Sequence, residues 1–229
     1  METSLHRQLK QMYADAAAQL EVRVGDFRID AIHGRRLVEI QHGALGAIRD
    51  KIRTLVETHP VLVVKPIVAS KLLVKLAEKG GAEVGRRLSP KRGRILDLFD
   101  ELVHFTRAFP HRRLTLEVPL VEIEERRYPG HGRRRRWSRS DFQVDDQLLV
   151  RVVETHRFRT AADLLALLPP GLPQPFQTQD LAARINVPRF RAQRIAYCLL
   201  RMGAVRQVGK QGNARLYELA IAIRKAASA

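Results

Sequence analysis

The chain has 229 residues, enough for one large domain or for two smaller domains that each bury a core. Its 41 Lys and Arg residues against 24 Asp and Glu residues give a net charge of +17, which favours a polyanionic partner such as DNA because neutralised phosphates release counterions. One cysteine excludes a disulfide framework, and no apolar run approaches the roughly 18 residues of a membrane span, so we expect a reduced, cytoplasmic, nucleoid-associated protein without a membrane partner.

The first predicted elements are a helix and a strand. Thr3 or Ser4 can cap a helix that runs to about residue 18, with apolar residues at helical spacing. Glu2 opens this helix, where it could reach an adjacent metal or favour the positive end of the helix dipole. Alternating apolar residues over 20–24 predict a strand, and Gly25-Asp26 predicts a tight turn into the next strand.

The next turn creates the most informative pattern in the chain. Asp30 and Glu39 lie equally far on either side of Gly34-Arg35, a pair suited to a two-residue type II′ turn. That register places the two carboxylates opposite each other, roughly 5 Å apart at Cβ, with Gln41 on the same face. Opposed carboxylates repel unless a proton or a cation lies between them. The hairpin therefore predicts a Mg²⁺ or Mn²⁺ site, with the main-chain carbonyl of Ile40 as a further ligand.

The following residues predict alternating helices and strands. Amphipathic helices are expected over 44–58 and 93–107, with a buried strand at 61–64 between them. A second hairpin, about 71–77 and 82–88, turns on Gly80-Gly81. We therefore expect an α/β domain over residues 1–112.

The middle of the chain, residues 113–174, is predicted as a basic linking region. Residues 114–124 alternate as a strand, and Pro119 favours an edge position for it. Short helices are expected at about 144–155 and 160–168. Between the strand and the first of these helices lies a basic, aromatic segment suited to phosphates and stacked bases, unless it is only a solvated loop. Its predicted nucleic-acid contacts are Arg133, Arg134, Arg135, Arg136 and Trp137.

The proline-rich stretch before residue 176 marks the last predicted boundary. Residues 175–220 read as helix, short turn, second helix and two strands, and 221–229 as a tail. This order resembles a winged helix-turn-helix domain, which we expect to fold independently and to bind duplex DNA. Arg189, Arg191 and Arg194 are predicted to point outward from the second helix, and Lys210 lies in the wing. A protein-binding winged helix is the alternative.

Asp30 followed by Glu39-Ile40-Gln41 resembles the core motif of the PD-(D/E)XK nuclease superfamily, with Gln in place of the usual Lys. The run from Val38 to Gly43, followed by a helix that contains Arg53, is most similar to CoiA-type competence proteins. The resemblance implies a restriction-endonuclease-like mixed sheet flanked by helices. It also implies a metal-dependent active site with catalytic residues Glu2, Asp30, Glu39 and Gln41.

Gln41 departs from the motif in a way that matters for chemistry. Lysine would stabilise an attacking hydroxide by charge, whereas glutamine can only orient water by hydrogen bonds. The cations that could replace it are Arg49, Lys51, Arg53 and Lys65, which the sequence does not rank. His6 and His42 could also line the site, but no histidine or cysteine spacing predicts zinc.

The predicted function is a metal-dependent DNA phosphodiesterase that acts in DNA processing, repair or defence. One alternative is a catalytically inactive nuclease-fold protein that binds DNA as an accessory. Another is a transcription regulator with an unrelated sensor domain. The sequence leaves open the substrate form, the sequence specificity and the oligomeric state, a homodimer included.

Overall fold

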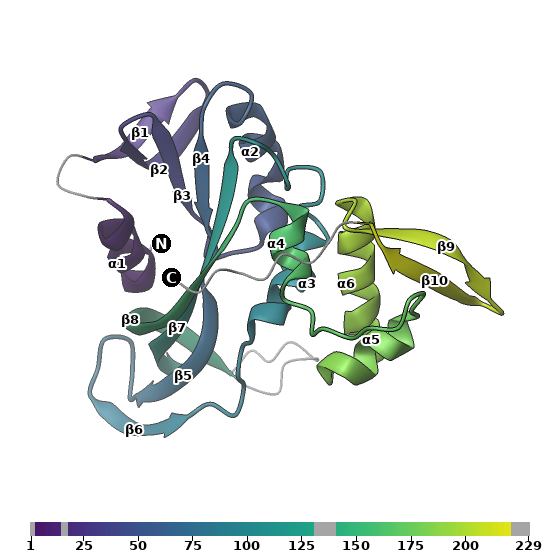
Figure 1. Cartoon of the computed structure of the whole chain (residues 1–229). Helices are drawn as coiled ribbons and strands as arrows, with labels where there is room; N and C mark the ends of the chain where they lie inside the picture. Colours follow the sequence, from purple (N-terminus) through teal and green to yellow (C-terminus); the bar gives the residue numbers. More distant parts are fainter. Residues whose placement is uncertain (1–2, 15–17, 131–140, 221–229) are drawn as a thin grey trace.

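The computed structural model describes residues 3–14, 18–130 and 141–220, and an eight-stranded mixed sheet organises most of them (Figure 1). The path through the sheet is β1-β2-β3-β4-β7-β5-β6, and β8 also pairs with β7. The strands are β1 (Gln19–Val24), β2 (Phe27–His33), β3 (Arg36–Ile40), β4 (Val61–Val64), β5 (Ile67–Leu76), β6 (Glu83–Leu88), β7 (Leu114–Pro129) and β8 (Phe142–Phe158).

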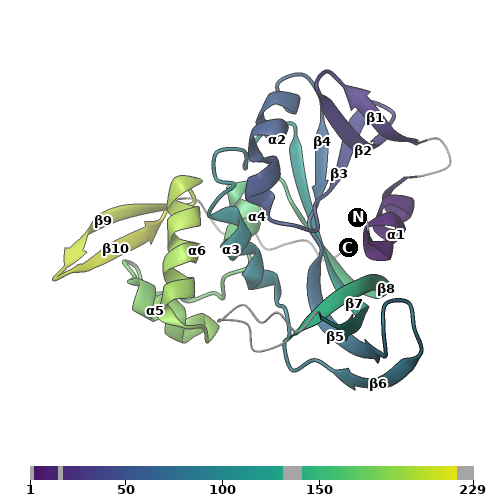
Figure 2. The same cartoon turned by 180° about the vertical axis from the view of Figure 1, so that it is seen from behind.

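Helices cover both faces of this sheet (Figures 1 and 2). Helix α1 (Ser4–Tyr13) packs Leu5 and Leu9 on one face, in a cluster with Val38, Ile40 and Val121. The other face carries η1 (Leu45–Ile48), α2 (Arg49–Leu55), η2 (Ile95–Asp97), α3 (Leu98–Leu102) and α4 (Ala161–Leu165). The chain is thus an α/β protein with a mixed sheet flanked by helices, as the sequence predicts. No described helix is long and apolar enough to cross a membrane.

The predicted hairpin register is present next to the turn. Gly34 adopts a φ of +58°, which suits glycine, and His33 lies opposite Arg36. Ala31 then lies opposite Val38, and the antiparallel pairing ends there. The chain crosses through α2 and returns in β4, which is parallel to β3 and fully buried. The buried strand at 61–64 and the hairpin around Gly80 are confirmed.

Strand β7 is central, so its predicted edge position is wrong. Its pairing with β4 ends where Val64 lies opposite Glu117, and its pairing with β5 begins where Ile67 lies opposite Leu120. Pro119 lies between those two partners, where that side of β7 has no hydrogen-bonding neighbour. The missing proline N–H is therefore tolerated in the middle of the sheet.

The helix predicted at about 144–155 is also wrong, because those residues form most of β8. This strand pairs with β7 over almost its whole length, from Pro129 opposite Phe142 to Leu116 opposite Phe158. Pairing between distant residues overrides the local helical pattern. The region 113–174 therefore contributes two strands to the main sheet and is not a linking region.

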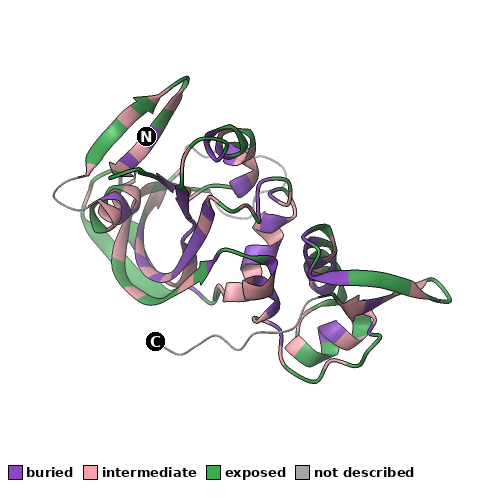
Figure 3. Ribbon diagram, turned by 45° about the horizontal axis from the view of Figure 1, so that its top comes forward, coloured by how far each residue is buried: buried purple, intermediate pink, exposed green. Residues whose placement is uncertain are grey.

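The C-terminal elements are α5 (Thr178–Ile185), α6 (Arg189–Arg201), β9 (Val205–Gln211) and β10 (Ala214–Leu219). The two strands form a ribbon that extends away from the sheet (Figure 1). Helix α6 packs against α3 and α4, and its Ile195, Cys198 and Leu199 belong to one buried cluster with residues of those helices. Figure 3 marks the buried residues of the chain in purple. This shared core is an argument against the expected independent folding of residues 176–219.

Cys198 lies inside this shared core. Its Sγ atom is within 3.7 Å of the carbonyl oxygen of Phe99, and the side chain is fully buried. Burial raises the pKa of the Cys198 thiol to about 12. The thiol therefore remains protonated at neutral pH and serves packing.

Candidate functional site

Asp30 lies where the β2–β3 pairing ends, and both of its oxygens accept hydrogen bonds. Oδ2 accepts from the N–H of Ile40 at 2.8 Å, and Oδ1 is 3.2 Å from Nε2 of His6 on α1. The side chain therefore occupies the position that a main-chain carbonyl of β2 would take in a continued ladder. It fixes the end of β3 to the first helix.

Glu39 is buried, and its partner comes from α2, which covers the face of the sheet opposite to α1. Its Oε1 accepts a hydrogen bond from Nζ of Lys51 on α2 at 2.6 Å, and the same ammonium donates to the carbonyl oxygen of Arg28 at 2.5 Å. Its Oε2 is buried without a hydrogen-bond partner in the described part of the chain. A buried carboxylate oxygen without a partner is costly, so it marks a position that a cation would stabilise.

The direct opposition expected for the two carboxylates is only partly present. The hairpin brings Asp30 and Glu39 together, but the recorded pairing stops at Ala31 and Val38. Asp30 turns toward His6 and Glu39 toward Lys51. The cause is local, because Asp30 substitutes its own side chain for a ladder bond to Ile40.

The environments of the two carboxylates move their pKa values apart. Burial acts to raise the pKa of Asp30, but the hydrogen bonds from His6 and Ile40 outweigh it and hold that pKa below its usual value. Burial raises the pKa of Glu39 more than the Lys51 ammonium lowers it, and the charge of Asp30 raises it further. The two groups therefore sense each other electrostatically, and Asp30 is the more acidic.

A hollow of about 550 Å³ opens beside Asp30. Its walls carry both acids and cations, because Lys10 pairs with Glu21 at 2.6 Å and Arg28 also contacts Glu21. The residues around it are Thr3, His6, Lys10, Glu21, Arg28, Asp30 and His42. Both histidines thus lie beside the same hollow as Asp30, as the sequence predicts.

Of the four cations considered as replacements for the motif lysine, the structure distinguishes Lys51. Arg49 and Arg53 both contact Asp50 instead. Lys65 donates to the carbonyl oxygens of His42 and Gly43, so it holds the loop after β3. The sequence contained the signal for Lys51, a lysine in the following helix, but no means of ranking it above its neighbours.

The other residues of the predicted motif, Gln41 and Ile40, lie at the end of β3 and in the loop that follows it. Nε2 of Gln41 donates to the carbonyl oxygen of Ala44 at 2.8 Å, which ties the side chain to the loop after β3. The N–H of Gln41 donates to Val64, so Ile40 lies at the end of the β3–β4 pairing. Glu2 lies outside the described residues.

The oxygen atoms of the two carboxylates are the kind of donor that a hard cation such as Mg²⁺ takes. Asp30, Glu39 and the Ile40 carbonyl offer only oxygen atoms, and Mg²⁺ typically takes one or two carboxylates together with waters and substrate phosphates. Within residues 3–14, 18–130 and 141–220, no group of three or more His, Cys, Asp and Glu side chains is arranged to hold a metal. An all-protein cage is therefore absent from those residues.

The predicted nucleic-acid contacts divide into three groups. Arg133, Arg134, Arg135, Arg136 and Trp137 lie outside the described residues. Arg189 and Lys210 are exposed, as expected. Arg191 and Arg194 do not point freely outward: Arg191 contacts Asp97 and Asp100, and Arg194 pairs with Asp100 at 2.7 Å. The exposed face of α6 instead presents Arg189, Phe190, Gln193 and Tyr197.

Replacing Arg194 with Ala should therefore change stability more than it changes the DNA affinity that the sequence predicts. We expect the free energy of unfolding to fall by up to about 1 kcal/mol, the usual range for a half-exposed ion pair, as measured by urea denaturation. DNA affinity, measured by fluorescence anisotropy, should stay nearly constant. Arg189→Ala is the matched control and should weaken DNA binding. Equal losses of affinity in both variants would contradict this assignment of Arg194.

Comparison with known families matches residues 3–159 to a family model described as "Domain of unknown function (DUF8091)". The matched stretch runs from the start of α1 to the end of β8 and so contains the whole main sheet. An uncharacterized protein of Treponema pallidum (strain Nichols) is 28% identical over 182 residues, which cover 79% of this chain and 71% of that protein. No solved structure matches the chain.

Proposed function

We propose that this chain, which belongs to the DUF8091 family, is a metal-dependent DNA phosphodiesterase with a reaction centre formed by Asp30, Glu39 and Lys51. One observation carries the proposal: the ammonium of Lys51 lies 2.6 Å from Glu39, which the hairpin brings next to Asp30. Two acids and one lysine are the groups that the resembled nuclease motif requires. Here the lysine comes from α2 and not from β3.

The order of the strands supports the nuclease fold. Strands β1, β2 and β3 are antiparallel neighbours, a helix follows, and β4 returns parallel to β3. A restriction-endonuclease-like core needs this succession, with the two acids on the second and third strands. We therefore propose that the sheet from β1 to β4, covered by α1 and α2, is such a core.

Asp30, Glu39 and the carbonyl of Ile40 would hold the metal. The unpartnered Oε2 of Glu39 supports this choice, because it is a buried oxygen that a cation would stabilise. A bound Mg²⁺ or Mn²⁺ would act as a Lewis acid at a phosphoryl oxygen and lower the pKa of a water.

The protein groups have separable roles in this mechanism. Lys51 donates two hydrogen bonds, to Glu39 and to the carbonyl of Arg28, and an ammonium has three hydrogens to donate. The third hydrogen of the ammonium can stabilise negative charge on an attacking hydroxide or a phosphate oxygen. His6 holds the orientation of the Asp30 carboxylate. Gln41 orients the loop through Ala44.

We also propose that α5, α6, β9 and β10 form a winged helix-turn-helix that places the enzyme on duplex DNA. The succession of two helices and a two-stranded ribbon supports this proposal. Arg189 on α6 and Lys210 on β9 supply exposed positive charge for phosphate contacts.

The proposal is tested with purified protein, linear, supercoiled and branched DNA, and lanes that contain Mg²⁺, Mn²⁺ or EDTA. Cleavage should require the metal. Lys51→Met should lower the cleavage rate by about 10²–10³-fold, the usual cost of losing one stabilising donor, with DNA affinity nearly unchanged. Arg53→Met, on the same helix, is the matched control and should keep full activity because Arg53 pairs with Asp50 and not with Glu39.

A second variant distinguishes loss of charge from loss of fold. In Lys51→Met, the further change Gln41→Lys restores the lysine to the strand position of the resembled motif and should recover part of the rate. Full activity in Lys51→Met, or cleavage that runs equally well in EDTA, would refute the proposed mechanism.

One observation favours a second function. Lys51 already neutralises Glu39 and His6 already binds Asp30, so the site is satisfied by protein groups apart from one oxygen. This would suit a nuclease-fold accessory protein that binds DNA without cutting it. Binding without cleavage under every metal condition would favour that function.

A further inference from the structure

We propose that the hollow between β5, β6, β7 and β8 binds an unstacked base of single-stranded DNA. The proposal deepens the function proposed above by adding that the substrate contains a single-stranded segment, and it rests on that function for its link to cleavage. The hollow has a volume of about 510 Å³ and lies at the ends of these four strands.

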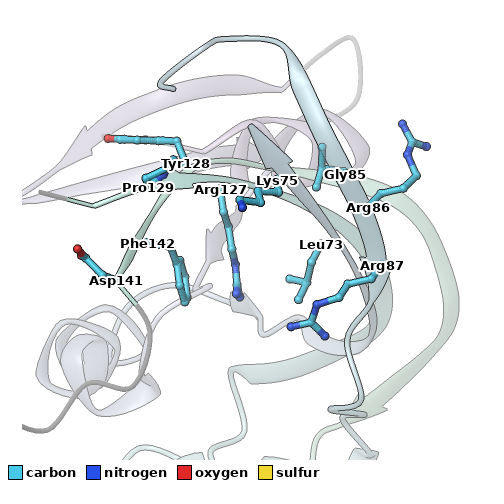
Figure 4. A pocket seen from close by; sticks show the side chains of 11 residues that line it. Leu73, Lys75, Gly85, Arg86, Arg87, Arg127, Tyr128, Pro129, Asp141 and Phe142 are labelled. Atoms are coloured by element: carbon cyan, nitrogen blue, oxygen red, sulfur yellow. The ribbon is translucent and has the colours of Figure 1, made fainter. Parts of the chain in front are cut away.

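The side chains that enter the hollow come from several strands. In Figure 4, Leu73, Arg127 and Phe142 lie side by side and project in the same direction, with the guanidinium of Arg87 near them. Leu73 lies opposite Arg87 in the β5–β6 pairing, which explains their common face. Apolar surface thus lines the hollow, and cations lie beside it.

In this hollow the guanidinium of Arg127 lies over the ring of Phe142, and the stacked pair forms a platform for a base. The Cζ atom of Arg127 lies 3.8 Å from the centre of the Phe142 ring, and the side of Phe142 is partly open to solvent. A flat base can stack on the exposed face of this pair, because nucleobases stack on aromatic rings and on arginine planes alike.

Buried polar contacts hold the platform in place. Arg127 pairs with Glu125, which is only 2% exposed. Glu125 also accepts from Lys71 and, at 2.7 Å, from Nε2 of Gln147. Arg127 is therefore fixed before a ligand arrives, which lowers the entropy that binding must overcome.

The charges beside the hollow match a phosphate backbone. Lys75 and Arg87 are exposed and have no ion-pair partner among the described residues. Glu83 is engaged by Arg86, and Glu125 is buried under Arg127. Asp141 also borders the hollow, but Figure 4 shows its side chain pointing away from Arg127 and Arg87. A base in the hollow would thus leave its phosphates near two unpaired cations.

The hollow lies on the same face of the sheet as Asp30. Odd-numbered residues of β7 share one face, and they include Val121, which packs with Leu5 and Leu9 of α1, and Arg127. His6 of the same helix binds Asp30. A strand with one base in the hollow can therefore extend along the α1 face toward Asp30. Bases in a duplex are stacked on their neighbours and cannot enter.

The experiment uses the full chain in EDTA, so that binding is read without cleavage. The probes are a short single strand that carries 2-aminopurine, its duplex, and free 2-aminopurine deoxynucleoside monophosphate. Stacking on Phe142 should quench the fluorescence of the single strand. Phe142→Ala should abolish the quenching and weaken single-strand affinity on the order of 10-fold, whereas Phe142→Trp should retain both.

Val84→Ala is the matched control, because Val84 lies on β6, is 56% exposed and does not line the hollow. It should bind like the wild type, and thermal unfolding should show that every variant is folded. Unchanged quenching in Phe142→Ala would overturn the proposal. Equal affinity for the free monophosphate would assign the hollow to a free nucleotide and overturn the strand assignment. An absence of any quenching, with apolar peptides bound instead, would also overturn it.

The outcome is separable from that of the proposed function. Quenching that depends on Phe142, in a protein that cleaves nothing with Mg²⁺, would support the hollow and refute the phosphodiesterase. Metal-dependent cleavage that Phe142→Ala leaves unchanged on single strands would support the phosphodiesterase and refute the hollow.

Discussion

Replacing Asp30 with Asn, or Glu39 with Gln, is expected to lower metal-dependent DNA cleavage by about 1,000-fold or more, while DNA binding stays equal or strengthens. Both changes keep the shape of the side chain. In Asp30→Asn the amide oxygen can still accept from the N–H of Ile40, and in Glu39→Gln it can still accept from Lys51. Each change removes one negative charge, so it weakens metal binding and reduces repulsion of phosphate.

Three measurements check this expectation: the cleavage rate in Mg²⁺ and Mn²⁺, Mn²⁺ affinity by calorimetry, and DNA affinity by anisotropy. Asp50→Asn is the matched control, because Asp50 is an exposed acid on α2 whose partners are Arg49 and Arg53. It should leave the rate and the metal affinity unchanged. Cleavage that persists at the wild-type rate in both Asp30→Asn and Glu39→Gln would exclude these carboxylates from the reaction.

The second large effect concerns the core between the sheet and the C-terminal elements. Phe99→Ala should lower the free energy of unfolding by about 3–5 kcal/mol, since a large buried side chain is replaced by a cavity. Phe99 is 1% exposed and belongs to the same cluster as Ile195, Cys198 and Leu199. We expect the main sheet and the α5–β10 elements to unfold in one transition in both the wild type and the variant.

Urea denaturation followed by circular dichroism, with limited proteolysis in parallel, measures this cooperativity. Phe190→Ala serves as the control, because that phenylalanine is 52% exposed on α6 and its loss should cost well under about 1 kcal/mol. The isolated fragment 175–220 should show no cooperative transition, because it would expose the face of α6 that α3 covers. A fragment that unfolds cooperatively would show that the shared core is dispensable.

The hairpin could be predicted from the sequence because the residues of its turn fix the register of the two strands. Glycine at position 34 adopts the positive φ that the turn needs, and the neighbouring pairs follow from it. The buried strand β4 and the turn at Gly80 were predictable for the same reason. Contacts of this kind lie within a few residues of the signals that specify them.

Long-range partners could not be read from the sequence. Residues 144–155 form a strand because they pair with β7. Pro119 fits in the centre of the sheet only because the pairing of β7 with β4 ends before it and the pairing with β5 begins after it. The pattern of α6 by itself predicted that Arg194 points outward, whereas in the structure it pairs with Asp100 of α3. The pairing of Lys51 with Glu39 likewise depends on how α2 crosses the sheet.

The central position of β7 also has a consequence for the order of folding during synthesis. Strands β1 to β4 and the β5–β6 hairpin leave the ribosome first, yet the two groups are joined in the sheet only through β7. Until residues 114–129 emerge, β4 and β5 each present an open edge of unpaired main-chain groups. A nascent chain of this length is therefore prone to association with other unfinished chains, and the sheet can close only when β7 is complete.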